Sequence, residues 1–204
     1  LVVKGDGYGH GLVTAARAGL DAGATWLGTA DIDEAMALRG AGIDAPVLAW
    51  LIGPDQDLSD AVDQRVSLGL SSVGQLDQVV AAGSATTTPR IHLEVDSGMG
   101  RGGVVESDWE EMLQRTAQEV RRGALVLEGV FPHLSLKSAE SDSTQLERFD
   151  RFLALLDSHN LQPEVIHSGA SVGALRTPHA ADTFARFGIS AYGFPLTPEH
   201  ESLG

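Results

Sequence analysis

The feature that most constrains the fold of this 204-residue chain is a repeat in which a short apolar segment, a turn and a helix-period segment follow one another. Eight apolar segments have the length and the aliphatic content of buried β-strands. They span residues 1–4, 26–30, 46–51, 66–70, 90–95, 125–131, 163–167 and 184–189. Strands that alternate with helices predict a parallel sheet, and eight of them close a (β/α)8 barrel of the TIM type.

An open, doubly wound α/β sheet is the alternative arrangement. No GxGxxG motif follows the first apolar segment, which counts against a dinucleotide-binding version of that fold. Capping-box patterns, in which a side chain accepts a hydrogen bond from an amide three residues later, mark four expected helix starts. These are Asp31-x-x-Glu34, Ser72-x-x-Gln75, Ser107-x-x-Glu110 and Asp142-x-x-Gln145.

The overall charge excludes two classes of partner. The chain has 28 acidic and 14 basic residues, and its net charge of −14 repels nucleic acid and anionic lipid. No apolar run approaches the roughly 18–20 residues that cross a bilayer. The absence of cysteine excludes disulfides and thiolate metal ligands and fits a reducing cytoplasm, where we expect the protein to be located. We also expect no metal site.

The densest group of reactive side chains lies at the start of the chain, where an apolar run ends in Lys4. Residues 5–11 contain four glycines, which permit a tight turn, with Tyr8 and His10 between them. An amine at the end of a buried strand is desolvated, which lowers its pKa and makes Lys4 a candidate Schiff-base nucleophile. The only other lysine is Lys137, in a polar loop where we expect it to be solvated. The alternative is that Lys4 simply closes a strand and reaches solvent.

A second group of polar residues ends the segment at 90–95. Strand alternation places His92, Glu94 and Asp96 on one face of that strand. A carboxylate facing the inside of a barrel needs a partner, and Arg101 in the following loop is the candidate. A structural ion pair at the end of the strand is an equal alternative.

Other polar residues follow the last three apolar segments. Active sites of such barrels collect at the C-terminal ends of the strands, which is where His133, His167, Ser171 and Arg186 fall. Ser171 and the amides opening the next helix would suit a phosphate group. A single histidine such as His133 is by itself more often structural than catalytic.

These segments resemble, in order, the motifs of the alanine racemases, pyridoxal 5′-phosphate (PLP) enzymes that interconvert L- and D-alanine. The resemblance runs from Lys4 to Gly193 and includes Lys4-Gly-Asp-Gly-Tyr8-Gly-His-Gly, Asp96-Ser-Gly-Met-Gly-Arg101 and Arg186-Phe-Gly188-Ile189. Two positions depart from the family pattern. Ala170 stands where the family has asparagine, and Glu94 stands where many racemases carry a carbamylated lysine.

The resemblance implies a role for each of these residues. Lys4 would hold PLP and act as one catalytic base, and Arg101 would contact the PLP phenolic oxygen and the substrate carboxylate. His133 would stack on the pyridine ring. Glu94 would orient Arg101, for which Glu94→Gln should raise the Michaelis constant, and His167 would orient Arg186. Tyr8, Ser171 and the amides of Gly188 and Ile189 would bind the phosphate.

Arg186 carries the most specific implication. In the family, the matching arginine meets the pyridine nitrogen. Because an arginine stays protonated, it donates a hydrogen bond there and keeps that nitrogen unprotonated. The weaker electron sink that results favours racemisation over transamination.

The resemblance also sets expectations for the whole protein. We expect residues 1–196 to be the PLP-binding barrel and residues 197–204 to begin the connection to a C-terminal β domain that this chain lacks. The chain begins at Leu1 inside an apolar run, so we expect it to lack the first residues of the barrel as well. The intact enzyme would be a homodimer that supplies D-alanine for peptidoglycan, with the second base a tyrosine from the partner's β domain. We therefore expect the fragment to bind PLP but to racemise poorly.

Three other functions remain open. The chain could be a non-catalytic PLP carrier, against which the Asp96–Arg101 motif argues because it handles a substrate carboxylate. It could also be a racemase of serine or lysine, which uses the same apparatus. The last alternative is a PLP-independent barrel enzyme that acts on a sugar phosphate.

Overall fold

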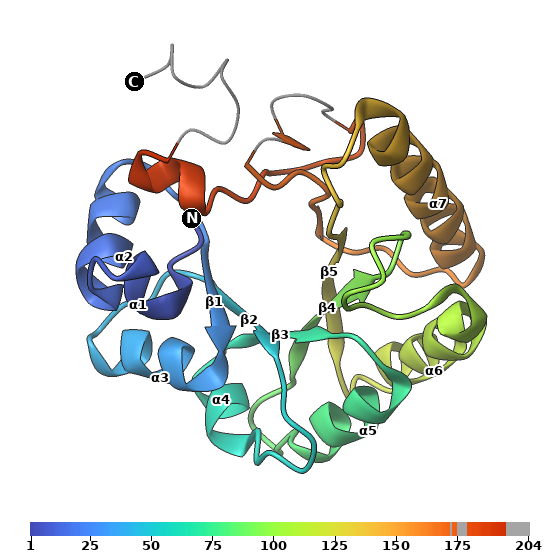
Figure 1. Ribbon diagram of the computed structural model, residues 1–204. Helices are drawn as coiled ribbons and strands as arrows, with labels where there is room; N and C mark the ends of the chain where they lie inside the picture. The colour runs from blue at the N-terminus through green and yellow to red at the C-terminus, as the bar shows by residue number, and fades with distance from the viewer. Residues whose placement is uncertain (172, 175–178, 195–204) are drawn as a thin grey trace.

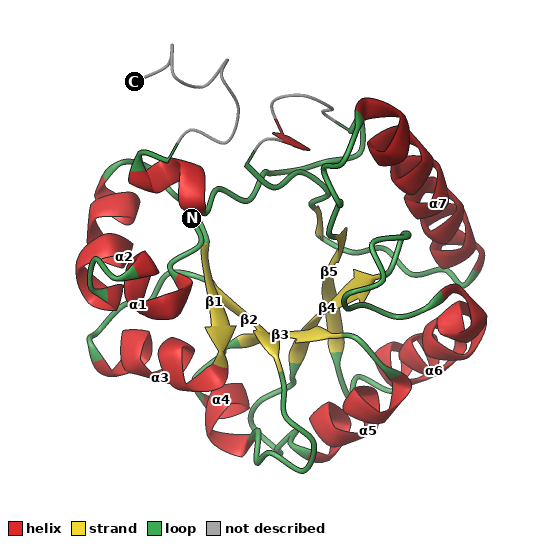
Figure 2. Ribbon diagram, in the orientation of Figure 1, coloured by secondary structure: helices red, strands yellow, loops and turns green. Residues whose placement is uncertain are grey.

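The centre of the protein is a parallel sheet of six strands that follow one another in sequence order (Figure 1). This computed structural model describes residues 1–171, 173–174 and 179–194. The strands are β1 (Leu27–Asp31), β2 (Val47–Leu51), β3 (Ser67–Leu70), β4 (Arg90–Val95), β5 (Val126–Pro132) and β6 (Val165–Ile166). Figure 2 shows these strands on the inside and the helices around them. Sequential parallel strands joined by helices are the layout expected from the alternating pattern.

Two further segments close this sheet into a TIM-type barrel. At one edge, Val2 forms a parallel bridge with Gly28 of β1. At the other edge, Ala170 forms a parallel bridge with Arg186. The two segments then meet, because the amide of Val2 donates to the carbonyl oxygen of Phe187 over 2.7 Å. The six strands and these two segments together supply eight parallel segments of a closed barrel, which confirms the predicted fold.

The predicted strands at 1–4 and 184–189 are nevertheless wrong as regular strands. Each is reduced to a single bridge, and Lys4 already begins the turn α1 (Lys4–Tyr8). The segment at 163–167 is also shorter than predicted, with only Val165–Ile166 in β6. Gly5 follows the first of these segments directly, and Gly188 interrupts the last, so that the backbone leaves the ladder there after one pair.

Helices cover the outside of the sheet. They are α2 (Leu12–Asp21), α3 (Ile32–Gly40), α4 (Ser59–Asp63), α5 (Val73–Ala81), α6 (Trp109–Arg121) and α7 (Ala139–Ser158), with a short 3₁₀ helix at Glu106–Asp108. The left-handed turn α1 and the 3₁₀ helix Ile189–Tyr192 lie instead at the end of the barrel where the strands finish. The main apolar core lies between helices and sheet. It includes Leu93 of β4 and Phe149 of α7, neither of which is exposed to solvent. No helix in the described ranges is both long enough and apolar enough to cross a membrane.

The predicted helix starts are confirmed at two of the four positions. Asp31 accepts from the amide of Glu34 over 2.9 Å, and Ser72 accepts from that of Gln75 over 3.4 Å. The other two are wrong. Helix α6 begins at Trp109 after Asp108, with no side-chain cap. Asp142 lies inside α7, which is capped instead by Ser138 accepting from the amide of Ser141 over 3.1 Å.

Removing the Ser138 cap should destabilise the protein measurably. Ser138→Ala leaves a first-turn amide of the 20-residue helix α7 without its side-chain acceptor. We expect the free energy of unfolding, measured with urea, to fall by about 1 kcal/mol. Ser107→Ala is the matched control, because exposed Ser107 caps no helix and its loss should cost less than about 0.5 kcal/mol. Equal losses in the two variants would contradict this assignment.

The expected domain boundary at residues 196 and 197 falls in the segment 195–204, which lies outside the described residues. The same is true of much of the segment after Ser171, where a phosphate-binding helix start was expected, since residues 172 and 175–178 are also outside them.

Candidate active site

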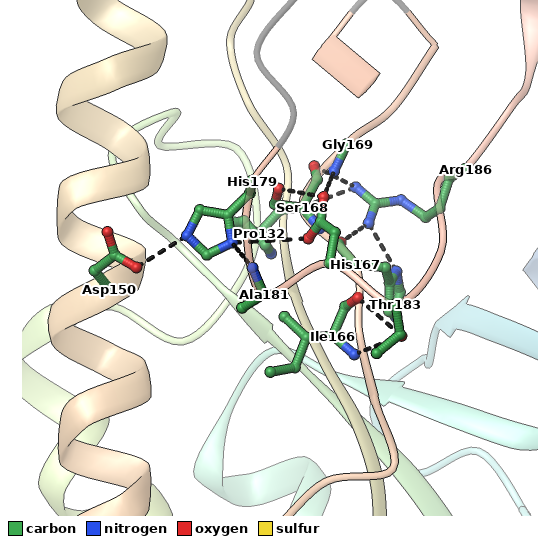
Figure 3. A network of polar contacts seen from close by, with 11 residues as sticks. Pro132, Asp150, Ile166, His167, Ser168, Gly169, His179, Ala181, Thr183 and Arg186 are labelled. Carbon is green, nitrogen blue, oxygen red and sulfur yellow. Dashed lines mark hydrogen bonds and ion pairs between the residues drawn. The ribbon is translucent and has the colours of Figure 1, made fainter. Parts of the chain in front are cut away.

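A cavity of about 220 Å³ opens where the strands end, at the carboxyl side of the barrel. Nine of the ten residues to which the family resemblance gives a role line it. They are Lys4, Tyr8, Glu94, Arg101, His133, Ser171, Arg186, Gly188 and Ile189. The tenth, His167, is fully buried behind Arg186 (Figure 3). Residues spread over most of the sequence therefore meet in one place.

The loop after Lys4 folds as a single left-handed turn. Gly5, Asp6, Gly7 and Tyr8 have φ angles of 62°, 55°, 63° and 52°. Glycine accepts this conformation freely, whereas each L-residue with a side chain loses about 1 kcal/mol or more. The Asp6 carboxylate offsets part of this cost by accepting from the amide of Leu12 over 2.7 Å, at the start of α2. The turn thus ties Lys4 to the outer helices.

The amine of Lys4 lies in a partly buried, cationic environment. Burial lowers its pKa below the usual value, and the positive charge of Arg101 lowers it further, while Glu34 opposes the shift. A lowered pKa raises the fraction of neutral amine, which is the nucleophilic and basic form. The arrangement therefore suits a lysine that reacts with an aldehyde or accepts a proton.

Arg186 is buried and is held by acceptors on three sides (Figure 3). Its Nη1 lies 2.7 Å from Nδ1 of His167 and also donates to the carbonyl oxygen of His167. Its Nη2 donates to the carbonyl oxygen of Pro132 over 2.9 Å. Burial lowers the pKa of Arg186 to about 10, despite the opposing charges of Asp182 and Glu94. The guanidinium therefore still carries its charge at neutral pH.

The cavity concentrates positive charge in an acidic protein. Burial lowers the pKa of His133 to about 4, and the charges of Arg186, Arg101 and Lys4 add to the effect. His133 is therefore neutral at pH 7, among three cationic side chains. A small anion such as a phosphate or a carboxylate would be attracted into this pocket.

A narrow cradle forms between the last two parallel segments of the barrel, beside Tyr8. The amide of Gly188 donates to Oγ of Ser171 over 3.3 Å, and the amide of Ser171 donates to the carbonyl oxygen of Arg186 over 2.8 Å. Gly188 leaves the space for Tyr8, because a Cβ there would lie 2.6 Å from the tyrosine hydroxyl oxygen. Burial raises the pKa of Tyr8, so that its hydroxyl keeps its proton and can donate to an anion.

The ion pair considered for Arg101 is not formed. No contact within 4.0 Å joins it to Glu94 or Asp96 in the described part of the chain. Glu94 accepts instead from Oγ of Ser71 over 2.9 Å. Asp96 accepts from two amides of its own loop, at 2.9 and 3.0 Å, and so shapes the turn. Arg101 itself is exposed at the mouth of the cavity.

Sequence reasoning missed two carboxylates that support this site. Asp182 accepts from the amide and hydroxyl of Ser168 over 2.6 and 2.8 Å, and from the amide of Gly169 over 3.1 Å, which fixes the loop before Ser171. No local pattern marks it. Glu128 is buried inside the barrel in the middle of an apolar segment. A charged residue within the predicted strand 125–131 was a signal that could have revealed it.

Comparison with protein families assigns the chain. Residues 1–195 match the family described as "Alanine racemase, N-terminal domain". This chain belongs to that family. Within the described ranges, no group of three or more His, Asp or Glu side chains is arranged to hold a metal ion.

The family relationship extends to individual proteins. Alanine racemase of Thermobifida fusca is 44% identical over 201 residues, covering 97% of this chain and 54% of that protein. That of Salinispora tropica is 42% identical over 207 residues, covering 99% of this chain and 56% of that protein. The solved alanine racemase from Streptomyces coelicolor A3(2) superposes with a TM-score of 0.93 at 36% identity, over 98% of this chain and 54% of that one. The chain thus spans about half the length of the relatives that it matches.

Proposed function

We propose that this chain is the PLP-binding barrel of an alanine racemase, which interconverts L- and D-alanine. The observation that carries the proposal is the meeting of Lys4, Arg186 and the Ser171–Gly188 cradle in one cationic cavity. The intact enzyme would be a cytoplasmic homodimer that supplies D-alanine for peptidoglycan.

The donor set fits PLP. Lys4 would hold the aldehyde covalently, since its pKa is lowered by burial and by Arg101. Arg186 would donate to the pyridine nitrogen. Tyr8, Ser171 and the backbone amides of Gly188 and Ile189 would bind the phosphate, in the place between the last two strands where barrels of this kind hold one. When bound, PLP supplies an electron sink for negative charge at the substrate Cα.

The other side chains would handle the amino acid. Lys4 would take or return the Cα proton on one face of the substrate. Arg101, exposed at the mouth, would bind the carboxylate. Glu94 would balance part of the positive charge of the cavity, and neutral His133 would pack beside the ring without adding a charge. The second base would be a tyrosine of the partner's C-terminal β domain.

Borohydride trapping tests the proposal directly. After incubation with PLP and reduction, peptide mapping should find the pyridoxyl label on Lys4 and not on Lys137, which is exposed. Lys4→Arg should lose the label completely, because an arginine forms no stable imine, while Lys137→Arg should keep it. Equal labelling of both lysines, or no label at all, would refute the proposal.

A second measurement separates a racemase from a PLP carrier. Adding D- or L-alanine, or D-cycloserine, to the PLP-loaded chain should change its visible absorbance, because the added amine would take the place of Lys4 on the aldehyde. A carrier would show no selective change. Arg101 distinguishes the two physically, because a carrier has no need of a cation for a carboxylate at the mouth of the cavity.

A further inference from the structure

Beneath the cavity, the inside of the barrel holds polar side chains that the proposed chemistry does not use. Ser67, His92 and Glu128 are at most 5% exposed, and His167 is fully buried. Groups of this kind cost free energy unless they are hydrogen-bonded, so their partners are informative.

These side chains form one continuous row of hydrogen bonds, here called the hydrogen-bond relay, which ends at Arg186. Nη1 of Arg186 lies 2.7 Å from Nδ1 of His167. Figure 3 draws these two side chains from close by. Nε2 of His167 lies 2.9 Å from Nδ1 of His92. Nε2 of His92 lies 3.3 Å from Oε2 of Glu128. Glu128 also accepts from Ser67, and its Oε1 accepts from Nε of Arg90 over 2.6 Å.

The chemistry of Arg186 and Glu128 at the two ends fixes the direction in which the hydrogen bonds of the relay are donated. A guanidinium can only donate and a carboxylate can only accept. Nδ1 of His167 must therefore accept from Arg186, which places the imidazole proton on Nε2, facing His92. His92 in turn must accept at Nδ1 and donate from Nε2 to Glu128. Burial lowers the pKa of both histidines, and the charge of Arg186 adds to this, so that each carries a single proton.

Packing prevents the rings from turning over. The ring of His167 is stacked between Phe131 and Phe184, with both centroid distances 4.7 Å. His92 fills the space above Gly129, where a Cβ would lie 2.3 Å from its Nδ1. Since the rings are fixed, a change at Glu128 can be accommodated only by moving protons between nitrogens.

We propose that Glu128 is a positioning residue, which acts through His92 to hold His167 in the tautomer that accepts from Arg186. Its effect on the cofactor rests on the proposed function, while its effect on the tautomers does not. The Glu128 carboxylate lies at the end of the relay that is far from the cavity. Through the two histidines, it fixes the Arg186 guanidinium at the cavity floor in one hydrogen-bonded orientation.

Glu128→Gln should reverse the direction of hydrogen-bond donation along the relay, while the side chain at position 128 keeps nearly the same size and shape. Nε of Arg90 requires an acceptor, so the amide oxygen takes that side and the NH₂ group faces His92. Nε2 of His92 must then accept, which moves its proton to Nδ1. We expect the reversal to continue to His167, which then accepts at Nε2 and turns its Nδ1 proton toward the donating Nη1 of Arg186, an unfavourable contact that the carboxylate of wild-type Glu128 prevents.

Nitrogen-15 NMR of the imidazole rings, recorded without PLP, measures this outcome. In the wild-type protein, His92 and His167 should both be Nε2–H tautomers, and an Nδ1–H form of His167 would overturn the proposal without any variant. In Glu128→Gln, His167 should change to the Nδ1–H form. Glu164→Gln is the matched control, because it removes the other carboxylate on Arg90, at 3.3 Å, and should change neither ring.

A binding measurement completes the test. Glu128→Gln should weaken PLP binding about tenfold, because Arg186 loses the ring nitrogen of His167 as an acceptor and keeps only the carbonyl oxygens of His167 and Pro132. Lys4 should still be labelled at saturating PLP. An unchanged His167 tautomer in Glu128→Gln would overturn the positioning role, since Glu128 would then only pair with Arg90. Failure of wild-type Lys4 to label would refute the proposed function and leave the tautomer result standing.

Discussion

Replacing Arg186 with lysine should lower the free energy of unfolding by about 3 kcal/mol and weaken PLP binding, although the charge is retained. The guanidinium donates in two directions, to His167 and to the carbonyl oxygen of Pro132. A lysine ammonium is a single point and cannot serve both. Each buried acceptor left without a donor costs about 1–3 kcal/mol.

The control for this variant is Arg122→Lys. Arg122 is 62% exposed and pairs with Glu119 over 3.0 Å on the outer surface. An exposed ion pair of this kind contributes little, so the change should stay within about 0.5 kcal/mol. Urea denaturation of both variants gives the comparison. If Arg186→Lys were as stable as the wild type, the buried hydrogen bonds of Arg186 would not be holding the loop.

Acid should destabilise the fold well above the pH at which carboxylates titrate. The pKa of His133 is lowered to about 4, and burial lowers those of His92 and His167 as well. In the unfolded chain these histidines take up protons below about pH 6.5, while in the folded protein they stay neutral. The unfolded state therefore binds more protons, and stability falls as the pH drops from about 6.5 toward 4.

The slope of this dependence is the quantity to measure. Each histidine that remains neutral contributes about 1.4 kcal/mol per pH unit within that window. The lowered pKa of Glu128 has its effect mainly below about pH 4.3, and so falls outside it. His92→Gln should unfold more easily at every pH but show a shallower slope than the wild type. A free energy of unfolding that is constant from pH 7 to pH 5 would contradict the assignment.

Much of the barrel and most of the site could be predicted because both depend on local order. Buried parallel strands are short apolar runs, and polar residues at their ends fall on one side of a closed sheet whatever the details of packing. Lys4, His133 and Arg186 were placed together on that ground, and the structure brings them to one cavity. The role of each stays a prediction.

What could not be predicted depends on contacts between distant segments. The pattern Asp142-x-x-Gln145 looks the same inside a helix as at its start, and only the fold shows that Ser138 is the cap. The partner of Glu94 is Ser71, on a loop 23 residues away, and not the nearby Arg101. The meeting of His92 with His167 requires the curvature of a closed sheet, which no single segment encodes.

Few hydrogen bonds close the barrel where its first segment, which holds Val2, meets its last, which holds Phe187. The amide of Val2 donates to Phe187 over 2.7 Å, and the hydroxyl of Tyr192 donates to the carbonyl oxygen of Val2 over 3.1 Å. Lys4 lies on one side of this seam, and Gly188 lies on the other. A ligand bound to residues on both sides would hold the first and last segments together, so that ligand binding and closure of the barrel would stabilise each other. Without ligand, the barrel would unfold first where these two segments meet, and with ligand bound it would unfold first at another place.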